Sequence, residues 1–215
     1  MKDLVSSFER DGCVVVPNVA AHSDLACADA FCDSVTLEGA GTRDLLEQPW
    51  CAAMANAVRS STPIRELLGA ATTAVQCTLF AKDAEHNWLV PLHRDYSIPV
   101  KARVSSPRWS AWSVKQSVVF GRPPPDVLQQ LVAVRIHLND TDAMNGALQV
   151  VPGSHQVDVE SGERSSHFVP RGGAFVMRPL LLHASSKLVG GSRRVLHFVF
   201  APKELPDGAE WANAV

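Results

Sequence analysis

Residues 132–138 read Val132-Ala133-Val134-Arg135-Ile136-His137-Leu138. Four aliphatic side chains alternate with an alanine, an arginine and a histidine, and this two-residue period is typical of a β-strand with one apolar and one polar face. In a two-layer jelly roll covered on one side by helices, the apolar face would pack against the helices and the polar face would point into the barrel. The pattern therefore predicts a polar site inside a β-barrel.

Further short β runs occupy the sequence after residue 70 and are separated by Pro, Gly, Asn and Asp. Including the run above, they cover residues 74–81, 87–99, 114–120, 131–138, 147–151, 173–177, 180–185 and 194–200. Many short runs at this spacing are typical of a sandwich or barrel. We therefore expect an all-β core.

The first 70 residues have a helical pattern instead. Ser23 can cap one helix, and Pro49 stands where a first helical residue tolerates proline. The apolar side chains of these two predicted helices are Leu25, Phe31 and Cys32 in the first and Trp50, Met54 and Val58 in the second. Residues 12–17 read as one short strand before them. We expect this region to support the β core from one side.

The composition limits the classes of function. The chain has 215 residues, of which 46% are hydrophobic and 20% charged, and its net charge is −2. One domain over 1–215 fits these values, with a mainly helical buttress over 1–70 and a β core over 71–203. A basic excess for nucleic acid, an apolar signal segment and an apolar run of about 18 residues are all missing. We therefore expect a cytoplasmic monomer or homodimer that binds neither nucleic acid nor membrane.

The cysteines agree with a reducing compartment. Their number is odd, and no two stand in a Cys-x-x-Cys pair: Cys13, Cys27, Cys32, Cys51 and Cys77. Buried thiols explain this pattern better than a disulfide framework or a zinc site.

Candidate metal ligands lie in two separate β runs. His93 and Asp95 are two residues apart, so on a strand they project from the same face. With eight histidines and 13 aspartates in 215 residues, about half of one His-x-Asp is expected by chance, so this pair alone indicates little. His183 ends a second apolar run, and Arg194 follows eleven residues later. A hairpin turning at 190–191 would bring that arginine beside the histidine.

The combination of these four residues is far more specific than any one of them. Two imidazoles and one carboxylate can occupy one face of an octahedral Fe(II) and leave three positions for a bidentate oxoacid and oxygen. An arginine offers a planar fork for the distal carboxylate of that oxoacid. The pattern indicates a non-haem iron site that uses an oxoacid.

At this point the sequence resembles the phytanoyl-CoA dioxygenase family of Fe(II)/2-oxoglutarate-dependent oxygenases. The resemblance covers most of the chain in four ordered segments: Phe8–Val16, Asn87–Asp95, Asn145–His155, and His183–Ser185 with Arg194. Members often carry an aromatic residue before the first histidine or a glutamine after it, where this chain has Leu92 and Arg94. By strand alternation these two neighbours face away from the iron, so the departure leaves the ligands unaffected.

The resemblance implies a double-stranded β-helix, that is, a jelly roll, with His93, Asp95 and His183 as ligands of Fe(II). It further implies that Arg194 binds the distal carboxylate of 2-oxoglutarate, that Ser185 adds a hydroxyl to this contact, and that Lys82 contacts 2-oxoglutarate or the substrate. The cosubstrates would be 2-oxoglutarate and O2, the by-products succinate and CO2, and the reaction hydroxylation of an unactivated C–H. Related halogenases lack the carboxylate ligand, so the presence of Asp95 favours hydroxylation.

Candidate substrate residues lie around and between the two halves of the triad. Residues 96–123 are aromatic and basic with little acid, which is typical of a lid that would suit an anionic small molecule. An ordinary loop with its tryptophans packed on the sheet is the alternative. The residues expected to contact substrate are Trp88, Tyr96, Arg135 and Trp112. If Arg135 is buried, it needs a carboxylate partner, which the substrate, 2-oxoglutarate or a protein acid could supply. His197 alternates with apolar neighbours and is expected in the core or directly behind the residues of the site. The segment 145–155 is expected to shape the barrel mouth.

Two other classes of function stay open at this level. One is a cupin-like metalloenzyme that does not use 2-oxoglutarate, against which Arg194 and Ser185 argue. The other is a non-catalytic jelly-roll binding protein, against which the intact triad argues.

Overall fold

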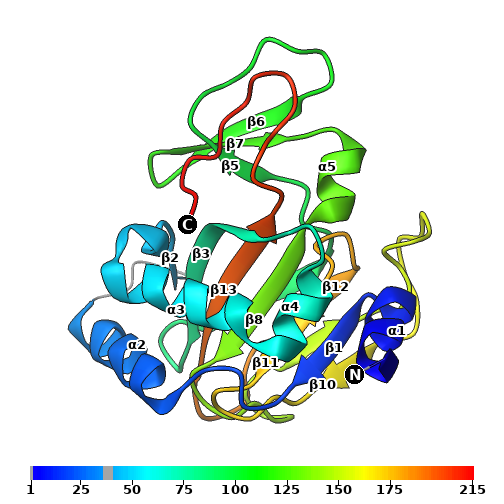
Figure 1. The fold of residues 1–215 in the computed structure, drawn as a ribbon. Helices are drawn as coiled ribbons and strands as arrows, with labels where there is room; N and C mark the ends of the chain where they lie inside the picture. Colours follow the sequence, from blue (N-terminus) through cyan, green and yellow to red (C-terminus); the bar gives the residue numbers. More distant parts are fainter. Residues whose placement is uncertain (1, 36–40) are drawn as a thin grey trace.

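The computed structural model describes residues 2–35 and 41–215, and its largest element is a six-stranded antiparallel sheet. The strand order is β1-β11-β8-β13-β3-β2 (Figure 1). The strands are β1 (Cys13–Val16), β2 (Gly41–Thr42), β3 (Thr73–Lys82), β8 (Val132–His137), β11 (Ala174–Met177) and β13 (Arg193–Ala201). The three central strands β8, β13 and β3 come from distant parts of the sequence, so the sheet depends on long-range pairing.

Helices from the N-terminal region cover one face of this sheet (Figure 1). They are α1 (Lys2–Asp11), α2 (His22–Ser34), the 3-10 helix η1 (Leu45–Glu47), α3 (Pro49–Ser60) and α4 (Thr62–Leu68). Val134, Ile136 and Phe198 of the sheet share one buried core with Met54 of α3 and Ile64 of α4. The predicted arrangement of the 132–138 strand, with its apolar face toward the helices, is confirmed. In the described part of the chain, no helix has the length and apolar character needed to cross a membrane.

A second antiparallel sheet faces the other side of the first and closes the jelly roll. Its order is β10-β9-β12-β4. The strands are β4 (Val90–His93), β9 (Leu148–Val150), β10 (Ser165–His167) and β12 (His183–Ser185). Apolar side chains from both sheets, among them Phe175 and Val150, fill part of the space between them. The predicted jelly-roll fold is confirmed. The polar side chains on the inner face of the large sheet point into the part of the interior that these apolar side chains do not fill.

A third, three-stranded sheet lies beside the barrel (Figure 1). Its strands are β5 (Ile98–Val100), β6 (Ser110–Lys115) and β7 (Val118–Arg122), and the short helix α5 (Pro125–Gln130) follows them. The C-terminal segment ties this sheet to the barrel: Trp211 bridges to Val100, and the backbone of Val215 pairs with that of Ala74. Residues 96–123 are therefore an ordered sheet, while their action as a lid stays a prediction.

The predicted β runs agree with the observed strands except where the chain reverses within a run. The run 114–120 contains the β6–β7 turn, where Gln116 and Ser117 both have positive φ. The run 87–99 is divided between β4 and β5. The short strands β2 and β10 were not predicted, because two or three polar or small residues give no periodic signal.

Two local predictions are wrong. The helix α2 begins at His22 after Ala21, without a side-chain cap, so Ser23 lies inside its first turn. The expected hairpin over residues 180–200 does not form, because β12 pairs with β4 and β9 whereas β13 pairs with β3 and β8. The two strands lie in opposite sheets, and their side chains meet across the barrel instead. The prediction that Pro49 begins a helix is confirmed.

We expect Phe198→Ala to lower the free energy of unfolding by about 3–5 kcal/mol, because Phe198 is fully buried between the sheet and the helices. Phe168→Ala is the matched control, since that ring is 54% exposed and its loss should change stability by less than about 0.5 kcal/mol. Urea denaturation followed by circular dichroism measures both. Equal destabilisation by the two substitutions would contradict the assignment of the core.

Candidate active site

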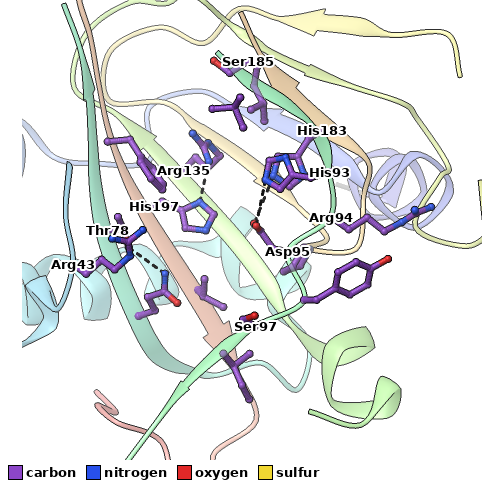
Figure 2. Close-up of a pocket in the computed structure, with 18 of the residues that line it drawn as sticks. Arg43, Thr78, His93, Arg94, Asp95, Ser97, Arg135, His183, Ser185 and His197 are labelled. Atoms are coloured by element: carbon purple, nitrogen blue, oxygen red, sulfur yellow. Dashed lines mark hydrogen bonds and ion pairs between the residues drawn. The ribbon is translucent and has the colours of Figure 1, made fainter. Parts of the chain in front are cut away.

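The strand pairing between β4 and β12 brings the predicted metal ligands together. His93 ends β4 and lies directly opposite His183, the first residue of β12, and the two imidazole ring centres are 4.2 Å apart. Asp95 follows β4, and its backbone N–H donates to the carbonyl of Pro179. The Asp95 carboxylate oxygens lie 3.5 Å from His93 Nε2 and 3.6 Å from His183 Nε2 (Figure 2). One ligand atom from each residue lies within 4.8 Å of the others, so the three can converge on one ion.

The backbone fixes both imidazoles in the form that binds a metal. His93 Nδ1 lies 2.8 Å from the carbonyl oxygen of Pro91, and His183 Nδ1 lies 2.8 Å from that of Leu181. A carbonyl only accepts, so each Nδ1 carries the proton and each Nε2 offers its lone pair toward Asp95. Burial lowers the pKa of His183, which keeps that imidazole neutral. Asp95 raises the pKa of His93, and a cation bound between them would compete with that proton. Two imidazoles and one carboxylate fit a divalent iron.

The triad opens into a cavity of about 460 Å³ inside the barrel (Figure 2). Both sheets and the three-stranded sheet contribute to its wall. The lining residues used below are Arg43, Gln76, Thr78, Phe80, Trp88, Tyr96, Lys115, Phe120, Arg135, Ser185, Arg193 and His197. Within the described residues, Asp95 is the one carboxylate that lines this cavity, whereas several side chains in the wall are cationic. The cavity is therefore suited to anions.

One end of the cavity holds a buried cluster of two cations and a hydroxyl. Lys82 Nζ lies 2.8 Å from Ser185 Oγ, and Arg193 Nη2 lies 3.0 Å from the same oxygen. Lys82 also donates to the carbonyl of Ser186, at 2.7 Å, and Arg193 donates to the carbonyl of Gly146. Burial, together with the nearby cations Arg193 and Arg135, lowers the pKa of Lys82 to about 7. The predicted grouping of Ser185 and Lys82 is present, and its arginine is Arg193.

The structure corrects the choice of arginine. Arg193 pairs with Lys82 in the β13–β3 register, so both project into the barrel. Arg194 projects from the opposite face of the strand, where its guanidinium lies 2.9 Å from Asp33 of α2. Counting from His183 selected Arg194, but β12 and β13 are not paired, so this count does not determine which face a residue occupies. Arg193 and His197 are separated by an even number of positions on β13, so they lie on the same face of the strand. The polar His197 is therefore the signal that selects Arg193.

The predicted substrate residues divide into those that line the cavity and one that does not. Trp88, Tyr96 and Arg135 line it. Trp112 does not: its ring stacks on Trp109, with centres 5.7 Å apart and planes at 8°, and it covers Gly121. The alternative of tryptophans packed on the sheet therefore holds for Trp112, while Lys115 and Phe120 of the same segment reach the cavity.

Several lining residues were not predicted as part of the site, among them Arg43, Gln76 and Thr78. His197 was expected in the core or directly behind the site, and it is a buried residue that lines the cavity. Thr78 and His197 are polar residues at alternate positions of apolar strands, which is a signal that could have identified them. Arg43 follows the short strand β2 and had no such signal.

The start of the segment 145–155 makes structural contacts beside the buried cationic cluster, while its role at the barrel mouth stays a prediction. The buried Asn145 side chain accepts from the backbone of Asp142 and donates to the carbonyl of Asp140. Gly146 has φ of +71° and turns its carbonyl toward Ser185 and Arg193. A β-carbon at this glycine would lie 2.8 Å from the Ser186 carbonyl oxygen, so the turn requires glycine. The segment thus supports the buried cationic cluster from outside.

Comparisons with solved structures agree with the fold and extend over nearly the whole chain. HygX from Streptomyces hygroscopicus, solved with nickel and 2-oxoglutarate, has a TM-score of 0.69 at 16% identity, over 96% of this chain and 89% of HygX. The 2-oxoglutarate-dependent carbocyclase SnoK from nogalamycin biosynthesis has 0.69 at 14%, over 95% and 85%. The epimerase SnoN from the same biosynthesis has 0.70 at 15%, over 96% and 86%.

Comparisons of sequence identify the family. No curated protein matches the chain. The model of the phytanoyl-CoA dioxygenase family matches residues 8–195, which include both halves of the triad and the buried cationic cluster. The chain therefore belongs to the phytanoyl-CoA dioxygenase family, and it is an oxygenase with iron and 2-oxoglutarate as its cofactors.

Proposed function

We propose that this protein hydroxylates an unactivated C–H of a small organic molecule and converts 2-oxoglutarate to succinate and CO2. The observation that carries the proposal is the placement of a metal-binding triad and a buried cationic cluster in one cavity. The bound iron and 2-oxoglutarate would supply the chemistry, by reducing O2 so that one oxygen atom enters the substrate. The residues of the chain hold, orient and enclose these groups.

His93, Asp95 and His183 would hold the iron. Their backbone hydrogen bonds and the β4–β12 pairing fix the ligand atoms before the metal binds, so little ordering is needed at that step. The carboxylate of Asp95 occupies a ligand position, and this favours transfer of a hydroxyl group over transfer of a halide. The free cysteines, four of them buried, agree with the reducing cytoplasm as the place of action.

Arg193, Lys82 and Ser185 would bind the distal carboxylate of 2-oxoglutarate. In the structure, Lys82 and Arg193 donate to neutral oxygens. The acceptors belong to Ser185, Ser186 and Gly146. A carboxylate in their place would bring opposite charge to a site with few water contacts, where such pairs are strongest. Phe80 and Trp88 line the cavity nearby and would exclude water, and Trp88 already lies under Lys82, 5.0 Å from its Nζ.

Anaerobic titration tests the proposal as a whole. Fe(II) followed by 2-oxoglutarate should produce a visible absorption band that needs both components, and succinate release should then identify substrates from a panel of small molecules. Product analysis separates hydroxylation from ring formation and epimerisation, the outcomes named for SnoK and SnoN. Metal binding without the band would favour the cupin-like alternative, and no metal binding would favour the non-catalytic one. The predicted monomer or homodimer is checked by light scattering on the same sample.

We expect His183→Ala to weaken Fe(II) binding by more than about 100-fold. Removal of a residue that only hydrogen-bonds to a metal ligand already weakens metal binding by about 10–100-fold, and a ligand itself contributes more. Anaerobic calorimetry measures the affinity, and circular dichroism confirms folding. His86→Ala is the control, since His86 pairs with Asp83 outside the cavity and should leave the affinity unchanged. Retention of full iron affinity by His183→Ala would refute the ligand assignment.

We expect Arg193→Met to weaken 2-oxoglutarate binding by about 10–100-fold, since a hydrogen bond to a charged group contributes about 1.5–3 kcal/mol. Arg194→Met is the matched control on the neighbouring residue, and it should change the affinity by less than about twofold, because an exposed ion pair contributes little. Calorimetry on the iron-loaded proteins measures both. The opposite order would restore Arg194 as the cosubstrate residue.

The pKa of Lys82 predicts a pH dependence. Lys82 is charged below its pKa of about 7 and loses its proton above it, and a bound carboxylate would raise that pKa. The affinity for 2-oxoglutarate should therefore fall as pH rises through 7 to 8.5, by at most about tenfold per unit. Lys82→Met should bind more weakly at pH 6.5 and show a flatter profile. A wild-type profile identical in shape to that of Lys82→Met would exclude a role for this proton.

A further inference from the structure

Three polar side chains form a row across neighbouring strands of the large sheet. In the registers of β3, β13 and β8, His197 pairs with Thr78 on one side and with Arg135 on the other. All three are buried and line the cavity. Figure 2 shows Arg135 and His197 across the cavity from the metal triad. This row lies beside the cluster assigned to 2-oxoglutarate, and burial together with the charge of Arg135 lowers the pKa of both Lys82 and Arg193.

Arg135 is a buried cation without an acidic partner. Its side chain is 7% exposed, and within residues 2–35 and 41–215 no carboxylate lies within 4.0 Å of it. The hydrogen bond that it makes in this part of the chain is to His197, with 3.1 Å between Nη1 and Nδ1. A guanidinium has five N–H donors and costs several kcal/mol to bury unpaired. Asp95 lies in the same cavity, but it is a metal ligand.

The contact with Arg135 decides which nitrogen of His197 carries the proton. A guanidinium only donates, so His197 Nδ1 must accept, and the proton of the neutral imidazole lies on Nε2. Among the described residues, Nε2 has no hydrogen-bond partner. The Thr78 hydroxyl accepts from Gln76 Nε2 at 3.1 Å and keeps its own O–H to donate. The row therefore presents guanidinium N–H groups, one imidazole N–H and one hydroxyl to the cavity.

In the proposed function the two carboxylates of 2-oxoglutarate have other partners than these donors. The distal carboxylate has Arg193 and Lys82, and the carboxylate next to the keto group would lie on the metal. Arg43 and Lys115 add positive charge elsewhere on the cavity wall. A second anion is therefore needed to balance Arg135, and the substrate is the remaining source.

We propose that Arg135 and His197 form a carboxylate anchor and that the substrate is a small monocarboxylic acid bound through that group. One fixed positive charge beside a neutral N–H donor matches a monoanion better than a phosphate dianion, and the planar guanidinium fork matches carboxylate geometry. The cavity of about 460 Å³ must hold 2-oxoglutarate as well, so the acid is small. The proposal rests on the proposed function, because it takes 2-oxoglutarate to occupy the other cluster.

Propionate is the probe, with propionamide as its neutral match. Nitrogen-15-labelled protein is loaded with 2-oxoglutarate and with Zn(II) in place of Fe(II), so that signals beside the metal stay visible. Propionate should shift the side-chain N–H signals of Arg135 and His197 saturably at constant ionic strength, and propionamide should not. Arg135→Met should weaken propionate binding by at least about tenfold and change 2-oxoglutarate affinity by a smaller factor.

Two further variants keep the test decisive. Lys115→Met removes an exposed cation of the same cavity and should change propionate affinity by less than about twofold. His197→Phe keeps a ring of similar size, lacks the N–H, and should weaken propionate binding even if Arg135→Met does not fold. Long-range proton–nitrogen spectra of the wild type should show the Nε2–H form of His197, and an Nδ1–H form would overturn the proposal.

The outcomes separate this proposal from the proposed function. Absence of saturable shifts at Arg135 and His197, or a loss of 2-oxoglutarate affinity in Arg135→Met with propionate binding intact, would overturn the carboxylate anchor. Failure of Zn(II) or 2-oxoglutarate to bind would instead count against the proposed function. The propionate titration is repeated on metal-free protein, where Arg135 and His197 should still respond if the anchor is correct.

Discussion

The two-faced character of the central strands β3, β13 and β8 is the constraint on which the rest of the structure depends. One face of these strands packs against the helices through side chains such as Leu79, Ile136 and Phe198. Because side chains alternate along a strand, the intervening residues must point into the barrel. A shift of one residue in register would place Arg135 among the helices and Ile136 in the cavity. The hydrophobic core therefore also fixes where the polar groups of the site lie.

This constraint explains how much could be predicted from sequence. The two faces of 132–138 carry their signal within a few residues, so this strand could be predicted directly. His93 and Asp95 gained significance only together with His183 and the family resemblance, and the structure brings these three side chains together. Arg193 and Arg194 are neighbours on β13, so they project from opposite faces of the strand. A residue count from His183, which lies on another strand, does not determine which of the two enters the barrel. Trp112 and Arg43 depend on how separate sheets and loops pack in three dimensions. Composition and local pattern do not record such packing.

The cavity is electrostatically incomplete without its ligands. Lys82 and Arg193 donate to neutral oxygens, and Arg135 donates to a neutral imidazole. Neutral acceptors satisfy the hydrogen bonds of a cation but leave its charge uncompensated. Bound anions would lower this cost and stabilise the folded chain by mass action. We therefore expect the folded chain to bind small anions in this cavity even when no reaction takes place.

The buried cationic cluster and Arg135 together would distinguish acids with one carboxylate from acids with two. Arg193 and Lys82 can hold one carboxylate. A molecule that binds there and also chelates the metal needs a second polar group at its other end, as 2-oxoglutarate has. A monocarboxylic acid bound at Arg193 would leave the metal without that chelate and Arg135 without an anion. The same acid at Arg135 leaves the buried cationic cluster free for 2-oxoglutarate, which can also chelate the metal. Two molecules of the acid would compensate both cationic groups but leave the metal without that chelate, so chelation together with charge balance favours the pairing of cosubstrate and substrate.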